Sequence, residues 1–368
     1  MRIYRDFTKP QPTHGFFRML RYKPSPPIIA SMLIFLTAPM AAAQQAGERL
    51  STDTLLWTRM TQDTSVWSSY LSESQEISTT DQQENSEGSS PEFKKVEYSI
   101  HGGGAYQFDS DIDDGGEFSV ARGGVVPAVT FNFDQRLSLT VKFSYLIDAY
   151  DFSGSGAFTS IRPWDNIHSL GLGADVRWHM NDQWTIYGGP TVKMSAESGA
   201  NFDEALFGGG YLGFSYRFSD QLLIGPGIGL LSEIEGDVDV IPILFVDWKP
   251  ITNVTLRTGR GLAATRGPGL ELAWAFTEHW EAGIAGRFDK LRFRLDDTGT
   301  GSNGVGEDKS FTLAATLDYS PSPKMQLSLA AGVILGGQLR LEDSSGTRLA
   351  NTDYDPVPFV GIATRLRF

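Results

Sequence analysis

The stretch "FVGIATRLRF", residues 359–368, decides the fold class. Successive side chains of a β-strand point to opposite faces, so this stretch has two faces of different character. One face carries Val360, Ile362, Thr364, Leu366 and Phe368, and the other carries Phe359, Gly361, Ala363, Arg365 and Arg367. A pair of arginines opposite leucine and phenylalanine indicates a sheet with an apolar outside and a wet inside.

The same alternation recurs along residues 94–368. It is clear in "RLSLTVKFSYL" (136–146), "SLGLGADVRW" (169–178) and "YLGFSYRF" (211–218). A soluble antiparallel sheet also alternates, but its apolar face is the core. Lipid is favoured here because the polar faces carry charges of both signs and because aromatic residues cluster beside short turns, as in a membrane-interface girdle. These aromatic residues are Trp178, Trp184, Trp248, Trp280, Tyr216 and Tyr319.

Short and long connections alternate between the expected strands. Short polar turns lie near Asp134 and at 181–183, 219–221, 249–253, 277–279 and 320–324, and longer Gly-rich loops lie at 109–116, 151–163, 196–204, 295–309 and 341–355. Outer-membrane barrels have short periplasmic turns, long external loops and spanning strands of roughly 9–11 residues. We therefore expect an all-β, transmembrane, antiparallel up-and-down barrel of about 14 strands, with 12 to 16 allowed.

The N-terminal region has a different composition. Residues 1–43 begin with a basic segment and continue with "PPIIASMLIFLTAPMAAAQQ" (26–45), an apolar run that ends in small residues. This order predicts a secretory signal peptide cleaved near Ala43. Pro26, Pro27 and Pro39 disfavour a membrane anchor, and Met19 is an alternative start. Residues 44–93 are Ser-, Thr- and Gln-rich and predict a mostly disordered linker, with a short helix at 52–71 as an alternative to a wholly disordered segment.

The final stretch resembles the C-terminal signal that bacterial outer-membrane β-barrels present to their assembly machinery. The matching residues are Phe368, Leu366, Ile362 and Val360, whereas Thr364 is less apolar than the usual residue. With the signal peptide, the alternation and the asymmetric connections, the region 94–368 is similar to uncharacterised Gram-negative barrel families. The resemblance implies a location in the outer membrane, contact with its lipid and lipopolysaccharide, and recognition by the barrel-assembly machinery; it implies no activity.

Charges on the expected inner face suggest a function. Unpaired charges in an apolar setting cost several kcal/mol, so the interior is expected to be wet or its charges paired. We expect a passive channel or transporter for small solutes; the alternatives are a plugged structural or surface-interaction barrel, a barrel enzyme, or a secreted soluble β protein. The predicted lumen-lining residues are Lys142, Asp175, Arg177, Arg217, Arg257, Glu271, Glu281, Arg287, Arg365 and Arg367.

Few residues suggest other chemistry. The chain has no cysteine and a net charge of −13, so we expect no cofactor, no thiolate metal site and no nucleic-acid partner. We predict no enzyme, because no serine follows the histidines in an arrangement that resembles the His-Ser pair of the outer-membrane phospholipases or deacylases. Asp109, Asp111 and Asp113 in "DSDIDDGGE" are a weak calcium candidate, because the glycine and glutamate positions of a calcium loop are not matched.

Overall fold

A computed structural model describes residues 94–236, 238–258 and 269–368 of the chain. The predicted signal peptide, the linker and the alternative helix at 52–71 lie outside the described residues. Among the described residues, no helix is both long enough and apolar enough to cross a membrane.

The described residues form fifteen strands, a short helix α3 (Ala157–Ser160) and a 3-10 turn η1 (Phe202–Ala205). The strands are β1 (Val96–Asp111), β2 (Glu117–Asn132), β3 (Leu137–Ser153), β4 (Asn166–His179), β5 (Trp184–Glu197), β6 (Leu206–Ser219), β7 (Leu222–Ser232), β8 (Val238–Ile251), β9 (Val254–Thr258), β10 (Gly269–Ala275), β11 (Trp280–Arg294), β12 (Val305–Ser322), β13 (Met325–Glu342), β14 (Arg348–Tyr354) and β15 (Val357–Arg367).

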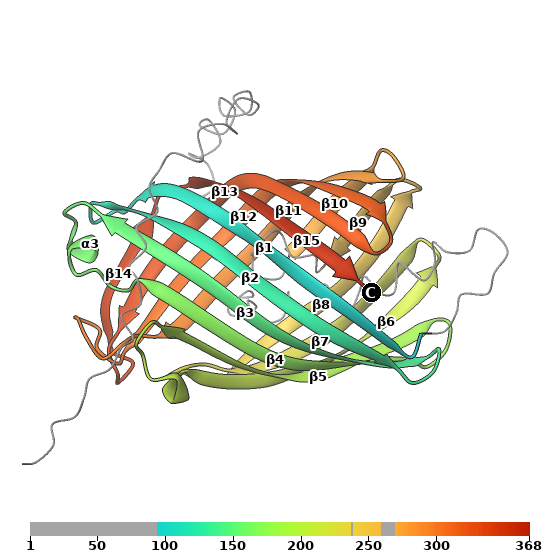
Figure 1. Ribbon diagram of the computed structural model, residues 1–368, viewed down its shortest axis with the longest axis horizontal. Helices are drawn as coiled ribbons and strands as arrows, with labels where there is room; N and C mark the ends of the chain where they lie inside the picture. Colours follow the sequence, from blue (N-terminus) through green and yellow to red (C-terminus); the bar gives the residue numbers. More distant parts are fainter. Residues whose placement is uncertain (1–93, 237, 259–268) are drawn as a thin grey trace, which may run out of the picture. The chain divides into compact units, whose positions relative to one another are not determined.

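The sheet closes into a barrel. Each strand from β1 to β13 pairs antiparallel with the next, and β15 pairs with both β13 and β1 (Figure 1). The segments β14 and β15 both pair with β13 and occupy one position in the wall, so the barrel has 14 strand positions. The predicted closed antiparallel up-and-down barrel is confirmed.

Side chains of the short turns hold the hairpins at one end. The carboxylate of Asp134 accepts hydrogen bonds from the backbone N–H groups of Arg136 and Leu137, both at 2.7 Å. Asn181 does the same for the turn between β4 and β5, and Thr277 for the turn between β10 and β11. These are the local bonds that make Asp, Asn and Ser/Thr frequent in tight turns. All six predicted short turns connect consecutive strands at this end, which we call the inner end.

The strands are longer than predicted at the opposite end, which we call the outer end. β12 and β13 each span 18 residues, and the predicted loops 295–309 and 341–355 contain the first residues of β12 and the whole of β14. The loop prediction was wrong there because polar and glycine residues were assigned to loops. Beyond the hydrocarbon layer a strand no longer needs apolar residues, so polar sequence continues the ladder.

The outward face of the barrel is apolar. Ile362 and Phe368 are 49% and 58% exposed, whereas Phe359 on the opposite face of β15 is 3% exposed. Large apolar residues are likewise exposed at alternate positions of the other strands. At the inner end, aromatic rings stack beside the turns, with Trp184 and Tyr216 4.8 Å apart and Trp280 and Tyr319 4.6 Å apart between centroids. A closed barrel with an apolar outside and an aromatic girdle is an outer-membrane β-barrel.

One pairing departs from simple strand order. At the outer end β11 also pairs in parallel with β5, at Arg294 and Ala196, although β6 to β10 lie between them in the sheet. The connection between β7 and β8 contacts the outward side of β11: Arg292 Nε donates to the carbonyl of Ile234 at 2.9 Å, and Lys290 pairs with Glu233. The wall therefore folds in on itself at the outer end.

Candidate functional site

The inner half of the barrel interior holds paired charges. On neighbouring strands β3 and β4, Lys142 Nζ lies 2.7 Å from a carboxylate oxygen of Asp175. The hydroxyl of Tyr211 on β6 donates to the same carboxylate at 2.8 Å. All three side chains are buried. Pairing and hydrogen bonding offset the cost of placing these charges inside the barrel.

A second charged group joins β9, β10 and β11. Arg257 donates to Glu271 at 3.0 Å and to Glu281 at 2.5 Å, so its guanidinium bridges two carboxylates. The hydroxyl of Thr316 on β12 donates to Glu271 at 3.2 Å. Burial among two carboxylates keeps Arg257 charged and fixes its planar donor group.

The other predicted lining residues lie at several levels. Arg177 and Arg287 are buried, with 6% and 2% of their surface exposed. Arg365 Nε donates to His101 Nε2 at 2.6 Å, which joins β15 to β1. Arg217 and Arg367 are half-buried near the inner ends of β6 and β15. Their role as the lining of a conducting pathway remains a prediction, as does the assembly role of the last strand.

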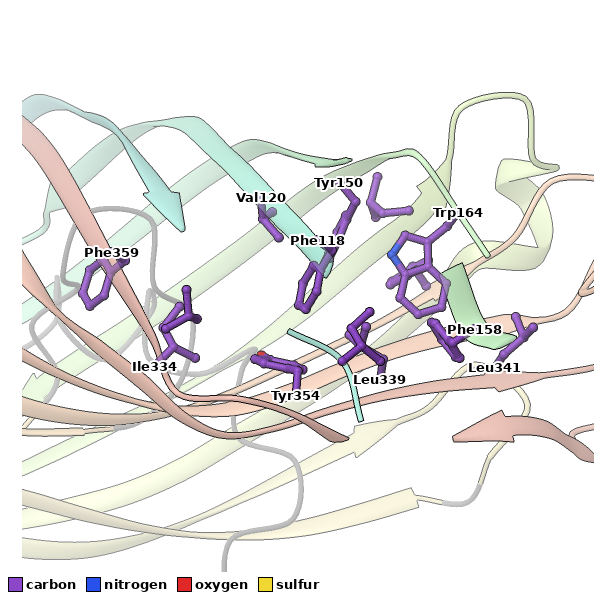
Figure 2. Packing of buried hydrophobic residues seen from close by; sticks show 14 of the residues in the cluster. Phe118, Val120, Tyr150, Phe158, Trp164, Ile334, Leu339, Leu341, Tyr354 and Phe359 are labelled. Atoms are coloured by element: carbon purple, nitrogen blue, oxygen red, sulfur yellow. The ribbon is translucent and has the colours of Figure 1, made fainter. Parts of the chain in front are cut away.

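The outer half of the interior is filled by a dry cluster, shown in Figure 2. Phe118, Ile167, Phe293, Leu339 and Leu341 are buried completely or nearly so. The hydrophobic effect and close packing stabilise such a cluster. A buried aromatic side chain typically removes about 150–250 Å² of surface from water. The remaining buried members are Ile112, Val120, Tyr150, Phe158, Trp164, Leu295, Ala285, Ala314, Ala330, Ile334, Tyr354, Val357 and Phe359.

Aromatic contacts in this cluster join segments that are not hydrogen-bonded neighbours in the sheet. Trp164, in the connection between β3 and β4, lies edge-on to Phe293 of β11, with centroids 5.1 Å apart. Trp164 also contacts Tyr150 at 5.8 Å, and Phe118 contacts Tyr354 at 4.9 Å. At the outer end β5 pairs with both β4 and β11, so the contact between Trp164 and Phe293 reaches across β5. Phe118 and Tyr354 lie on the strands to either side of the outer end of β1.

Glycines in the wall accommodate the rings. A Cβ atom at Gly306 would collide with Phe293 and approach Trp164, and one at Gly337 would collide with Tyr354. In the second buried cluster, on β5 to β8, Gly213 and Gly227 leave space for the ring of Phe245. At these positions glycine provides space that neighbouring rings fill.

A polar network accompanies the aromatic contacts, and we call Arg122, Asp148, Tyr150, Asp308 and Tyr354 the cross-barrel network. Asp308 of β12 accepts hydrogen bonds from the hydroxyls of Tyr150 and Tyr354 at 2.8 and 3.1 Å. Arg122 of β2 lies 3.3 Å from both Asp308 and Asp148. One charged group therefore connects β2, β3, β12 and β14.

A cavity of about 20 Å³ lies beside the cross-barrel network. Such a volume is about that of one water molecule. Its lining is mostly charged: Arg122, Asp148, Asp289, Lys290, Leu291, Asp308 and Ser310.

A carboxylate fixes the connections above the dry cluster. Glu197, the last residue of β5, accepts a hydrogen bond from the backbone N–H of Asp165 at 2.8 Å and another from that of Asp296 at 3.1 Å. These two residues belong to the β3–β4 and β11–β12 connections. Both connections are thus fixed to β5 where it pairs with β11.

Sequence reasoning missed the cross-barrel network. Arg122, Asp148 and Asp308 are charged residues at inward positions of alternating strands, the same signal that identified the inner residues. Alternation could therefore have added them to the predicted lining. It could not show that Arg122 and Asp308, 186 residues apart, would meet.

The histidines have neighbours that the sequence did not indicate. Ser198 Oγ lies 2.9 Å from His168 Nε2, and the hydroxyl of Tyr145 lies 2.9 Å from His168 Nδ1. These residues come from separate connections and strands, so sequence order hides the pair. The third group is a phenol, whereas hydrolytic triads use a carboxylate or amide there.

The calcium candidate stays untested. Asp109, Asp111 and Asp113 are exposed at the outer end of β1. Within the described part of the chain, no three acidic or histidine side chains converge as a metal site would require.

Comparisons with solved structures give outer-membrane barrels at very low identity. The chain is similar to an outer membrane channel from Pseudomonas putida F1, with a TM-score of 0.41 and 8% identity over 77% of this chain and 100% of the other. It is also similar to a FadL homologue from Pseudomonas aeruginosa, with a TM-score of 0.42 and 10% identity over 74% of this chain and 90% of the other. For the toluene transporter TodX from P. putida, the TM-score is 0.38 and the identity 9%, over 75% of this chain and 91% of the other. These likenesses carry no argument about the solute. No family model and no curated protein matches the sequence.

Proposed function

We propose that the chain is an outer-membrane channel for small polar solutes, closed at its outer end in the arrangement described above. The observation that carries the proposal is the difference between the two halves of the interior. The inner half carries charges paired between nearby strands, and the outer half is filled by the dry cluster and the cross-barrel network. The inner half offers polar groups along the wall. The outer half is held shut by the Trp164–Phe293 contact and by the cross-barrel network.

The inner charges suit small polar solutes better than ions of one sign. Lys142 is paired with Asp175, and Arg257 with Glu271 and Glu281. Paired charges of both signs produce a weak net field but many hydrogen-bonding groups. We therefore propose low ion selectivity, with no catalytic step.

The proposal includes a route to the membrane. The N-terminal segment would be removed near Ala43 after export, and the strand that carries Val360, Ile362, Leu366 and Phe368 would be recognised by the barrel-assembly machinery. The apolar outer face, with residues such as Ile284 at 61% exposure, supports a final position in lipid.

A second candidate function rests on the same dry cluster. A barrel whose outer half is permanently filled would conduct nothing and would act as a structural or surface-interaction protein. The complete burial of Phe118, Phe293 and Leu341 is the observation that favours this alternative.

Single-channel recording in planar bilayers separates the two candidates. We expect rare openings from the mature chain and frequent openings from the double variant Trp164→Ala/Phe293→Ala, because both rings of the cross-barrel contact are removed. Ile334→Ala is the matched control, since it shortens a buried side chain of the same cluster on β13. A folded double variant that stays silent would contradict the channel and support the filled barrel.

Charge reversal tests the inner half. In the open double variant, Glu271→Lys is expected to shift the reversal potential toward anions, because it adds two positive charges to the conduction path. An unchanged reversal potential would mean that Glu271 does not line the path.

A further inference from the structure

Charged residues occupy the outward face of β12 and β13 near the outer end. Leu339 and Leu341 belong to the dry interior cluster, so Arg340 between them lies on the outward face of β13. Asp308 faces the interior network, so Glu307 and Lys309 on either side of it face outward. These positions follow the lipid-exposed Phe311 and Leu313 on the same face of β12.

The depth of these residues matches the outer headgroup layer. Tyr319, in the inner aromatic girdle, and Lys309 are ten residues apart on β12. At a strand tilt of about 40° this separation spans about 25 Å along the barrel axis, the height of the apolar band in such barrels. Lys309 therefore lies where the hydrocarbon ends and lipid phosphates begin.

The bases are more exposed than the acids that hold them. Side chains of Lys309 and Arg340 are 18% and 21% exposed, whereas those of Glu307 and Glu342 are 3% and 10% exposed. Lys309 Nζ lies 3.0 Å from Glu307, and Arg340 Nη1 lies 3.5 and 3.6 Å from Glu307 and Glu342. The carboxylates lie deeper than the bases, so the more exposed charges of this group are positive.

Arg340 has donor capacity to spare. Its Nε–H is buried, and its Nη1 atom makes both carboxylate contacts. Its two carboxylate contacts are long for charge-assisted hydrogen bonds, which are typically about 2.7–2.9 Å. A planar guanidinium held this loosely by its carboxylates fits a phosphate group, which accepts two parallel bonds.

We infer that Lys309 and Arg340 bind a phosphate group of lipopolysaccharide in the outer leaflet. The chemistry needed is an anionic phosphate held at headgroup depth beside an apolar surface, which this lipid supplies. The outer ends of β1 and β3 are unsuited to it, because Asp109, Asp111 and Asp151 are exposed there. The lipid would therefore be bound on the β12–β13 side.

Binding of lipid A to the full mature chain in detergent tests the site. We expect Lys309→Gln and Arg340→Gln each to weaken binding about fivefold, and the double variant about 25-fold, since each basic residue near an anionic surface contributes a comparable share. Asp109→Asn/Asp151→Asn is the matched control: it also removes two charges at the outer end, and its affinity should not fall. Heat-dependent mobility on gels verifies that every variant is folded.

Three outcomes would overturn the inference. They are equal binding of dephosphorylated lipid A, unchanged binding by the folded Lys309→Gln variant, and full displacement of lipid A by millimolar inorganic phosphate, which would indicate a site for free phosphate. Lys309→Gln leaves Arg340 and both glutamates in place, so the test survives if the double variant fails to fold. The result is independent of conductance.

Discussion

The two halves of the barrel interior use ion pairs differently. In the inner half, Lys142 and Asp175 lie on adjacent strands, as do Arg257 and Glu271. In the outer half, Arg122 of β2 pairs with Asp148 on adjacent β3 and also with Asp308 on β12, a strand that does not pair with β2. A pair between neighbours leaves the centre of a barrel available, whereas a pair across the interior occupies it. The geometry of the pairing, more than the amount of charge, therefore distinguishes the two halves.

The largest effect is expected from removing the acceptor at the centre of the cross-barrel network. Asp308→Ala leaves the hydroxyls of Tyr150 and Tyr354 and the guanidinium of Arg122 without their carboxylate. We expect a loss of about 5 kcal/mol in the free energy of unfolding, at the upper end of the range for a broken buried pair. Urea titration in detergent micelles measures it.

A compensating variant serves as the control. Arg122→Met/Asp308→Leu removes both charges, and replacing both members of a buried pair by apolar residues is often neutral. Most of the lost stability should return. A double variant as unstable as Asp308→Ala would indicate that the charges themselves are needed.

The next largest loss in the free energy of unfolding is expected in a comparison of two phenylalanines on opposite faces of the wall. Phe118→Ala opens a cavity in the dry cluster and should cost about 3–4 kcal/mol. Phe143 is 45% exposed on the outward face, where lipid can fill the space, so Phe143→Ala should cost about 1 kcal/mol or less. Both values come from the same urea titration. Equal losses would mean that the outer interior is not tightly packed.

A smaller effect is expected at the inner turns. Asp134→Ala removes the acceptor of two backbone hydrogen bonds and should cost about 1 kcal/mol. Because the turn lies away from the dry cluster, channel openings should be unaffected. Asp343 at the outer end accepts bonds from Ser345 and Thr347, so Asp343→Ala is the matched control for loss of a turn acceptor. A change in openings with Asp134→Ala alone would link the inner turns to gating.

The serine beside a histidine is not expected to react as a nucleophile. Ser198 lacks the third carboxylate or amide of a hydrolytic triad, so a fluorophosphonate probe should not label the mature chain in detergent. Labelling of the native chain that disappears in Ser198→Ala would instead identify a nucleophile and reopen the enzyme alternative. Denatured protein is the background control.

Alternation and turn chemistry made the barrel predictable from sequence. Both are local signals. Val360 and Ile362 indicate the apolar face of their own strand, and Asp134 and Asn181 indicate turns because they bond to residues two and three positions along the chain. Pairs between consecutive strands, such as Lys142 with Asp175, follow once the hairpins are aligned.

Contacts across the barrel were not predictable in this way. Trp164 and Phe293 meet because the wall folds inward, and that shape depends on the pairing of β5 with β11. No local pattern in either segment encodes the other. The sequence consequently predicted inner charges as a lining but gave no sign of the contacts that fill the outer end.

The pairing of β1 with β15 closes the barrel, and we expect it to form late in folding. Ser99 pairs with Arg367, so two edges separated by almost the whole barrel sequence must find each other before either is satisfied. Until then β1 is an open template for any extended chain, including a second copy of this protein. Contacts at such separation form slowly, which lengthens the exposure. Unfolded copies at high concentration would compete most strongly for this edge, so assembly must above all protect it from pairing with other chains.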